Sequence, residues 1–121
     1  MASTGRFSQF LAITVTLAAA NTAYNVVALI QAALNTNGRN DPSNAPTDCR
    51  NYQINFASDL NTGTPHVYLG DANVSATQRM FSMSPGASEN RIDWRSVNLP
   101  LVLLYVFTDT AGSKIDIGVW Q

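Results

Sequence analysis

Residues 51–56, NYQINF, carry the clearest secondary-structure pattern in the chain. Their apolar or aromatic residues, Tyr52, Ile54 and Phe56, alternate one by one with three amide side chains. Successive residues of a strand point to opposite faces, so strict alternation predicts a strand with one face in a core and the other in water.

Working outward, similar patterns predict further strands. They cover about residues 9–18, 67–69, 80–83, 92–94 and 114–120, and turn residues such as Gly70-Asp71 and Pro85-Gly86 separate them. Residues 99–107, LPLVLLYVF, are apolar on both faces and predict a central strand or one covered by a partner. Turn signals every eight to twelve residues predict a mainly β fold, a single β-sandwich or barrel-like domain.

One helix is predicted in the N-terminal half. In residues 22–34, TAYNVVALIQAAL, the side chains of Tyr24, Val27, Ile30 and Leu34 have helical spacing, and Asn21 or Thr22 before them could cap the helix. The polar stretch 35–48 that follows is rich in Asn and Pro and predicts a long loop.

The length of 121 residues fits one domain. We expect residues 1–8 to form an N-terminal arm and residues 9–121 a single β-rich domain. The apolar run at 10–20 ends in three alanines and imitates a secretory signal. Thr14 and Thr16 interrupt that run at alternate positions, which favours a strand instead.

The composition is unusual in its lack of charge. Only 12% of the residues are charged, against about 25% in typical domains. Asn, Ser and Thr make up about a quarter of the chain, and the net charge is −1. A nucleic-acid partner and a membrane-surface role are not expected, because both require basic residues in excess. A neutral polar surface repels its own copies weakly, which suits a protein packed among neighbouring subunits.

The chemistry-bearing residues do not form a recognisable catalytic, metal or cofactor pattern. His66 is the only histidine and Cys49 the only cysteine, too few for a zinc site or an internal disulfide. Asp71 follows a glycine and is expected to accept hydrogen bonds from its own backbone. Accordingly, no catalytic residue, metal or cofactor is predicted. The aromatic residues Trp94, Tyr105 and Trp120 could line a sugar-binding groove, although such residues are more often core or interface anchors.

Several short motifs resemble a known group of proteins. The motifs are VYLGDANVSAT at 67–77, PGAS at 85–88, LYV at 104–106 and AGSKI at 111–115. They resemble motifs of small β-sandwich virion proteins of tailed bacteriophages, and the resemblance covers roughly residues 50–118. The long loop at 35–48 and the apolar segment at 80–83 depart from the pattern. Because the motif residues build turns and strands, they specify a fold rather than a site.

The resemblance implies a virion structural protein that decorates or cements the capsid surface by bridging neighbouring major capsid proteins. It implies the major capsid protein and copies of the chain itself, plausibly in a homotrimer, as partners. The residues expected at the subunit or capsid interface are Phe7, Phe10, Leu101, Leu103 and Tyr105.

Three alternatives stay open at this point. The chain could be a neck, tail or fibre component of the virion. It could be a carbohydrate-binding β-sandwich module, which requires exposed aromatic side chains. It could also be a secreted or pilus-like subunit, which requires cleavage after Ala20.

Overall fold

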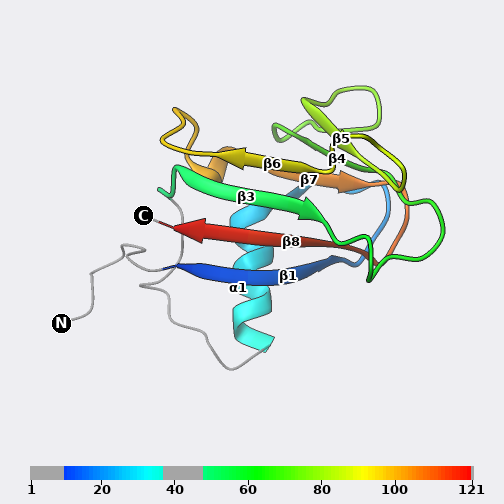
Figure 1. Ribbon diagram of the computed structural model, residues 1–121, viewed down its shortest axis with the longest axis horizontal. Helices are drawn as coiled ribbons and strands as arrows, with labels where there is room; N and C mark the ends of the chain where they lie inside the picture. Colours follow the sequence, from blue (N-terminus) through cyan, green and yellow to red (C-terminus); the bar gives the residue numbers. More distant parts are fainter. Residues whose placement is uncertain (1–9, 37–47, 121) are drawn as a thin grey trace.

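The computed structural model describes residues 10–36 and 48–120 of the chain (Figure 1). Eight strands, one α-helix and one turn of 3-10 helix make up this described part. The elements are, in chain order, β1 (Leu11–Leu17), β2 (Tyr24–Asn25), α1 (Val26–Thr36), β3 (Asn51–Phe56), β4 (Val67–Gly70), β5 (Phe81–Met83), β6 (Arg91–Trp94), η2 (Leu101–Leu103), β7 (Tyr105–Thr108) and β8 (Ser113–Trp120).

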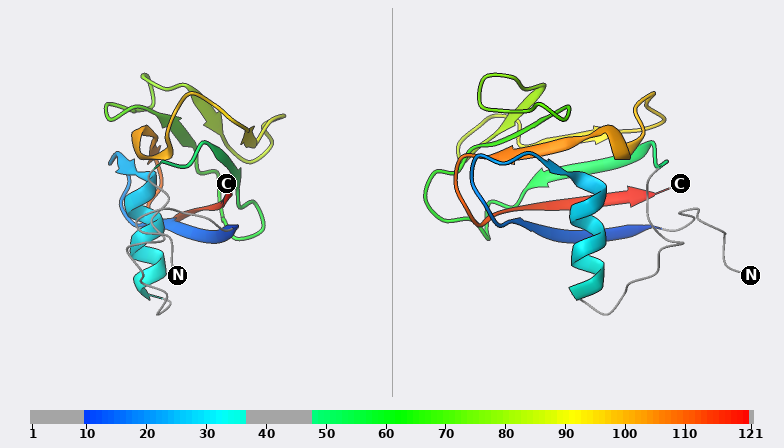
Figure 2. Two further views of the ribbon diagram at one scale, coloured as in Figure 1. Left: turned by 90° about the vertical axis from the view of Figure 1, so that its left-hand side faces the viewer. Right: turned by 180° about the vertical axis from the view of Figure 1, so that it is seen from behind.

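The strands form two four-stranded antiparallel sheets, which lie as two layers in the end-on view of Figure 2. The first sheet has the order β1-β8-β3-β6 and the second the order β2-β7-β4-β5. Strand β1 therefore pairs with β8, β2 with β7, β3 with β6 and β4 with β5. The second half of the chain runs back along the first half, and this wound ribbon is the jelly-roll form of the β-sandwich. The predicted mainly β sandwich is confirmed.

The core lies between the two sheets and is built by the alternating strands. In β3 the inward residues Tyr52, Ile54 and Phe56 are buried, as their spacing predicts. Ile54 sits between Ile92 of β6 and Ile117 of β8 in the first sheet. The strands predicted near residues 9–18, 67–69, 80–83, 92–94 and 114–120 are all present.

Helix α1 closes one side of the sandwich. It crosses the strands β1 and β8 on their inner side, as the front and back views agree (Figures 1 and 2). Val26, Ile30 and Leu34 recur at helical spacing and are buried against the core. Because the second sheet is built of short strands, the helix covers part of the first sheet that the second leaves open.

The start of the helix differs from the prediction. Residues Tyr24 and Asn25 form strand β2, and the helix begins at Val26. Asn21 lies in a turn with a left-handed φ of 58°, and its backbone N–H donates to the Thr108 carbonyl. The predicted cap at Asn21 or Thr22 is therefore wrong. Instead, the side-chain oxygen of Asn25 accepts a hydrogen bond from Ala28 N–H at 3.1 Å.

We expect Asn25→Ala to lower the free energy of unfolding by about 1–2 kcal/mol. Besides capping the helix, the Asn25 amide N–H donates to the carbonyl of Val102 at 2.7 Å, so one side chain ties the helix start to the η2 turn. Urea denaturation of the full chain measures this loss. An unchanged midpoint would show that neither bond contributes to stability.

The prediction of one strand over residues 99–107 is also wrong. Pro100 begins a turn of 3-10 helix over Leu101–Leu103, and only residues 105–108 form strand β7. The turn is closed by hydrogen bonds from Leu103 N–H to the Pro100 carbonyl and from Leu104 N–H to the Leu101 carbonyl. The apolar run is thus divided: Leu101 and Leu104 are buried, while Val102 and Leu103 face outward.

Candidate functional site

A concave surface of the described residues lies beside the η2 turn. We call it the Leu103 groove; its volume is about 570 Å³. The turn forms one wall, and the connection from β4 to β5 forms the other. The groove is lined by Gly70, Asp71, Asn73, Gln78, Arg79, Met80, Leu99, Leu103 and Leu104.

The motif after β4 builds one wall of this groove. A Cβ atom on Gly70 would lie only 3.1 Å from Cγ2 of the buried Val74, so the close contact favours glycine. Asp71 accepts a hydrogen bond from Asn73 N–H through its carboxylate, as its position in a turn predicts. The Ser75 hydroxyl oxygen accepts from the N–H of Thr77 and Gln78. These residues therefore fix the conformation of the connection between β4 and β5.

The same loop covers the outer face of the second sheet. Val74 packs there with Tyr68 and Phe107, and Tyr105 lies partly buried against them. The Arg79 guanidinium lies 4.8 Å from the centre of the Tyr68 ring, a cation–π contact that holds the loop down. This outer face is therefore closed by the chain's own residues.

Apolar side chains at the groove remain exposed. Leu103 is 55% exposed and Met80 is 51% exposed, and Val102 next to them is also open to solvent. Asp71 and Arg79 contribute charged groups to the lining. Exposed apolar side chains with a polar rim are typical of surfaces that bind another protein.

A second, smaller hollow lies on the outer face of the first sheet. We call it the Phe10–Trp120 hollow; its volume is about 310 Å³. It lies over strands β1, β8 and β3, with Gly118 at its floor. Phe10 is 70% exposed, and Trp120 is half-buried.

The predicted interface residues are distributed over different places. Phe7 lies outside the described residues. Phe10 lines the hollow, and Leu103 lines the groove. Leu101 is completely buried in the chain's own core, where it supports the η2 turn, and Tyr105 is partly buried on the second sheet.

The aromatic residues considered for a sugar-binding groove do not come together. Trp94 packs against the core, with its ring 5.7 Å from that of Tyr52. Tyr105 belongs to the second sheet and Trp120 to the outer face of the first. Sequence reasoning missed that Trp120 and Phe10 line the same hollow, because this depends on the β1–β8 register.

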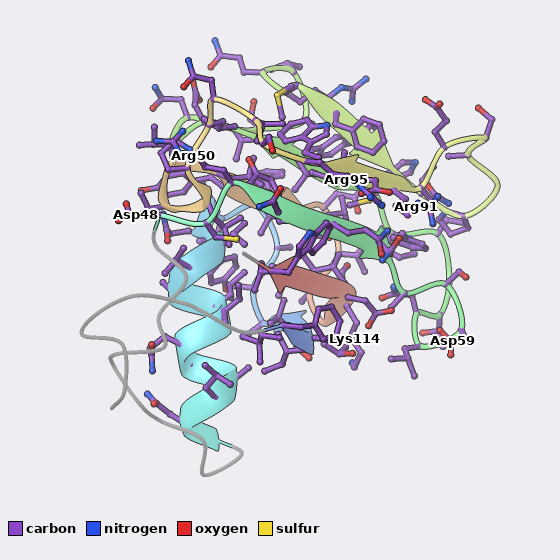
Figure 3. The ribbon with its side chains drawn as sticks, turned by 60° about the vertical axis from the view of Figure 1, so that its left-hand side comes forward. Asp48, Arg50, Asp59, Arg91, Arg95 and Lys114 are labelled. Atoms are coloured by element: carbon purple, nitrogen blue, oxygen red, sulfur yellow. The ribbon has the colours of Figure 1, made fainter. Side chains whose placement is uncertain are left out.

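The titratable residues are mostly separate from one another. Figure 3 shows Asp48 and Arg50 before β3, Asp59 and Lys114 near its other end, Arg91 at the start of β6 and Arg95 just after its end. Among the described residues, no three His, Cys, Asp or Glu side chains are grouped closely enough to hold a metal ion. No helix in that part of the chain is long and apolar enough to span a membrane.

Two buried groups have structural partners. Cys49 is buried, and its thiol lies within hydrogen-bond distance of the carbonyls of Asn51 and Trp120, to either of which its one S–H can donate. The Tyr52 hydroxyl donates to the Leu99 carbonyl at 3.0 Å. Burial, with a smaller contribution from the nearby Cys49, raises the pKa of Tyr52 to about 12. Both groups therefore hold the start of β3 in place.

His66, just before β4, and Asp109, just after β7, are in contact. His66 Nδ1 lies 2.8 Å from one Asp109 oxygen, and the other oxygen accepts from His66 N–H and the Thr110 hydroxyl. Burial acts to raise the pKa of Asp109, but the hydrogen bonds from His66 and Thr110 outweigh it, so the pKa is lower than usual. The carboxylate stabilises the turn that leads into β8.

This lowered pKa predicts a loss of stability in acid. A carboxyl group with a lower pKa in the folded than in the unfolded state stabilises the fold above its unfolded pKa. We therefore expect the stabilising effect of Asp109 to be full above about pH 4 and to disappear as the pH falls through its folded pKa. Unfolding by urea at several pH values measures it.

Asp109→Asn should remove this pH-dependent component, and high salt should weaken it because the pair is partly exposed. The control is Asp59→Asn, since no hydrogen-bond partner of the Asp59 carboxylate is recorded among the described residues. The same acid profile in wild type and Asp109→Asn would contradict this role.

Comparisons with known proteins give one structural similarity. No family model matches the chain, and no curated protein matches it in sequence. A chain of the empty particle of Kashmir bee virus at acidic pH is similar in structure, with 19% sequence identity and a TM-score of 0.45. The similarity covers 95% of this chain and 74% of the viral chain.

Proposed function

We propose that the chain is a structural protein of a virus particle, one that decorates or cements the capsid of a tailed bacteriophage by bridging neighbouring major capsid proteins. The Leu103 groove is the observation that carries this proposal. Its exposed Leu103 and Met80 form an apolar surface that water disfavours and a neighbouring subunit would cover.

The shape of the groove suits a protein partner. Leu103 projects from a turn that is anchored on both sides, because Leu101 and Leu104 are buried and Asn25 binds the Val102 carbonyl. A rigid apolar projection loses little conformational entropy on binding, which favours a stable contact. Asp71 and Arg79 could form polar contacts at the rim.

The surface as a whole also supports assembly. With 12% charged residues and a net charge of −1, neighbouring copies repel each other weakly. Even modest contacts add up when many copies bind a symmetric shell. The resemblance of the sequence motifs to small virion proteins of tailed bacteriophages agrees with this role. Residues of the motif at 67–77 also form one wall of the groove.

A deletion and add-back experiment tests the proposal. The gene for the chain is deleted from its phage, and the resulting particles are heated to measure the temperature at which they release DNA. We expect release at a lower temperature, and recovery when the purified full chain is added. Particles that are equally stable without the chain and that do not bind it would contradict the proposal.

The strand order favours a second candidate, a subunit of the shell itself. Viral capsid domains are among the proteins that use the jelly roll. In the deletion experiment, this candidate predicts that no closed particles form without the chain, whereas a decoration protein leaves particles intact but weaker.

A further inference from the structure

We infer that the Phe10–Trp120 hollow is a binding site for a neutral sugar, with one pyranose ring resting on the glycine floor against the aromatic side chains. The hollow lies on the outer face of the first sheet and shares no lining residue with the Leu103 groove. This inference is independent of the proposed assembly role.

The floor of the hollow is open because of Gly118. In the register of the first sheet, Gly118 of β8 lies between Ala12 of β1 and Gln53 of β3. A Cβ atom on Gly118 would meet only the Phe10 ring, at 3.9 Å, and its φ is not in the left-handed region. The backbone therefore does not require glycine at this position, and the missing side chain is what leaves room for a ligand.

Aromatic side chains bound one end of the hollow. Leu11 pairs with Val119, which brings Phe10 and Trp120 to the same end of neighbouring strands. The Arg95 guanidinium lies 5.7 Å from the centre of the Trp120 ring, a cation–π contact that can fix the position of the indole. Arg95 does not line the hollow, so this contact leaves the space for a ligand open. A flat apolar ring beside a polar wall suits the C–H face of a pyranose.

Amide and carboxylate groups form the other wall. The Thr14 hydroxyl donates to one Asp116 oxygen at 2.5 Å, and the Asn55 amide N–H donates to the Gln53 oxygen at 3.2 Å. These bonds hold the side chains and, within the described part of the chain, leave the second Asp116 oxygen and the Gln53 N–H groups for a ligand. Sugar hydroxyls both donate and accept hydrogen bonds, so acceptors and donors side by side match them. The negative Asp116 disfavours acidic or phosphorylated sugars.

The test is a titration of the full chain by NMR. The probes are methyl β-glucopyranoside, methyl β-galactopyranoside, methyl α-mannopyranoside and N-acetylglucosamine. The chain has two tryptophans, so Trp94→Phe assigns the two indole N–H signals. We expect at least one sugar to shift the Trp120 signal with saturation in the millimolar range, as is usual for one small ring, and to leave the Trp94 signal unchanged.

Gly118→Val adds a side chain at the floor of the hollow, where the new Cβ atom would meet only the Phe10 ring, at 3.9 Å, and valine suits a strand. We expect it to weaken sugar binding at least tenfold. The control is Thr16→Val, which also places a valine on a strand of the first sheet. Thr16 lies in β1, on the same outer face of the sheet as Gly118, and it does not line the hollow. Circular dichroism and thermal unfolding check that both variants fold.

The inference is overturned if none of the four sugars shifts the Trp120 signal, or if Gly118→Val binds the sugar as tightly as the wild type does. Binding of the chain to virus particles is a separate measurement, and it tests the proposed assembly role independently of sugar binding. Gly118→Val should still join particles, so a failure of sugar binding leaves the assembly role standing, and the reverse also holds.

Discussion

Replacing Leu103 with aspartate should reduce binding of the chain to its particle by roughly 100-fold or more while the chain stays folded. Leu103 is 55% exposed on the η2 turn, so the substitution removes no contact on which the core depends. In an interface, the change loses the burial of a leucine and forces a carboxylate out of water. Co-sedimentation of the purified variant with particles that lack the chain measures the effect.

The control for this prediction is a second exposed leucine. Leu60 is 49% exposed and lies on the turn that follows β3, where it does not line the Leu103 groove. Leu60→Asp adds the same charge with the same loss of apolar surface and should bind particles as the wild type does. Equal binding by Leu103→Asp and the wild type would show that the groove is not the interface.

Ile54→Ala should lower the free energy of unfolding by about 2–5 kcal/mol. Ile54 is completely buried in the first sheet, between Ile92 and Ile117, and its truncation leaves a cavity in the core. Because domains of this size are stable by only about 5–15 kcal/mol, the loss should be visible as a large shift in the urea midpoint.

The neighbouring residue gives the matched control for Ile54. Asn55 follows it on the outer face of β3, and Asn55→Ala should change stability by less than about 1 kcal/mol. If the two variants lost equal stability, the inward and outward faces of β3 would be assigned wrongly.

Most strands could be predicted from the sequence because their burial follows the period of two. Tyr52, Ile54 and Phe56 point inward in β3, and Ile115, Ile117 and Val119 do the same in β8. Alternation of this kind shows only which side chains of a strand point toward the core and which point toward solvent. It does not say which strands pair, so the jelly-roll order became known from the register of the structure.

Two predictions failed where contacts with distant segments overrode an apolar pattern. In residues 99–107, the Leu101 N–H donates to the distant Cys49 carbonyl, and Leu101–Leu103 form a turn of 3-10 helix instead of continuing as a strand. At the helix start, the backbone of Tyr24 and Asn25 pairs with β7, which delays the helix to Val26. Both cases depend on contacts with distant segments.

The candidate sites could be predicted only in part. Phe10 and Leu103 were expected at an interface, and both are exposed. The buried state of Leu101 was missed because an apolar run does not show which of its members turn inward. The role of Gly118 was missed as well, since a glycine within a strand pattern becomes a floor only when its neighbours across the sheet are known.

Counting the chain in purified virus particles tests the central claim most directly. Quantitative mass spectrometry of particles, with the major capsid protein as internal standard, gives the number of copies. A protein that decorates or cements the shell should be present in hundreds of copies and in a fixed ratio to the major capsid protein. Particles that contain none of it would contradict a structural role in the virion.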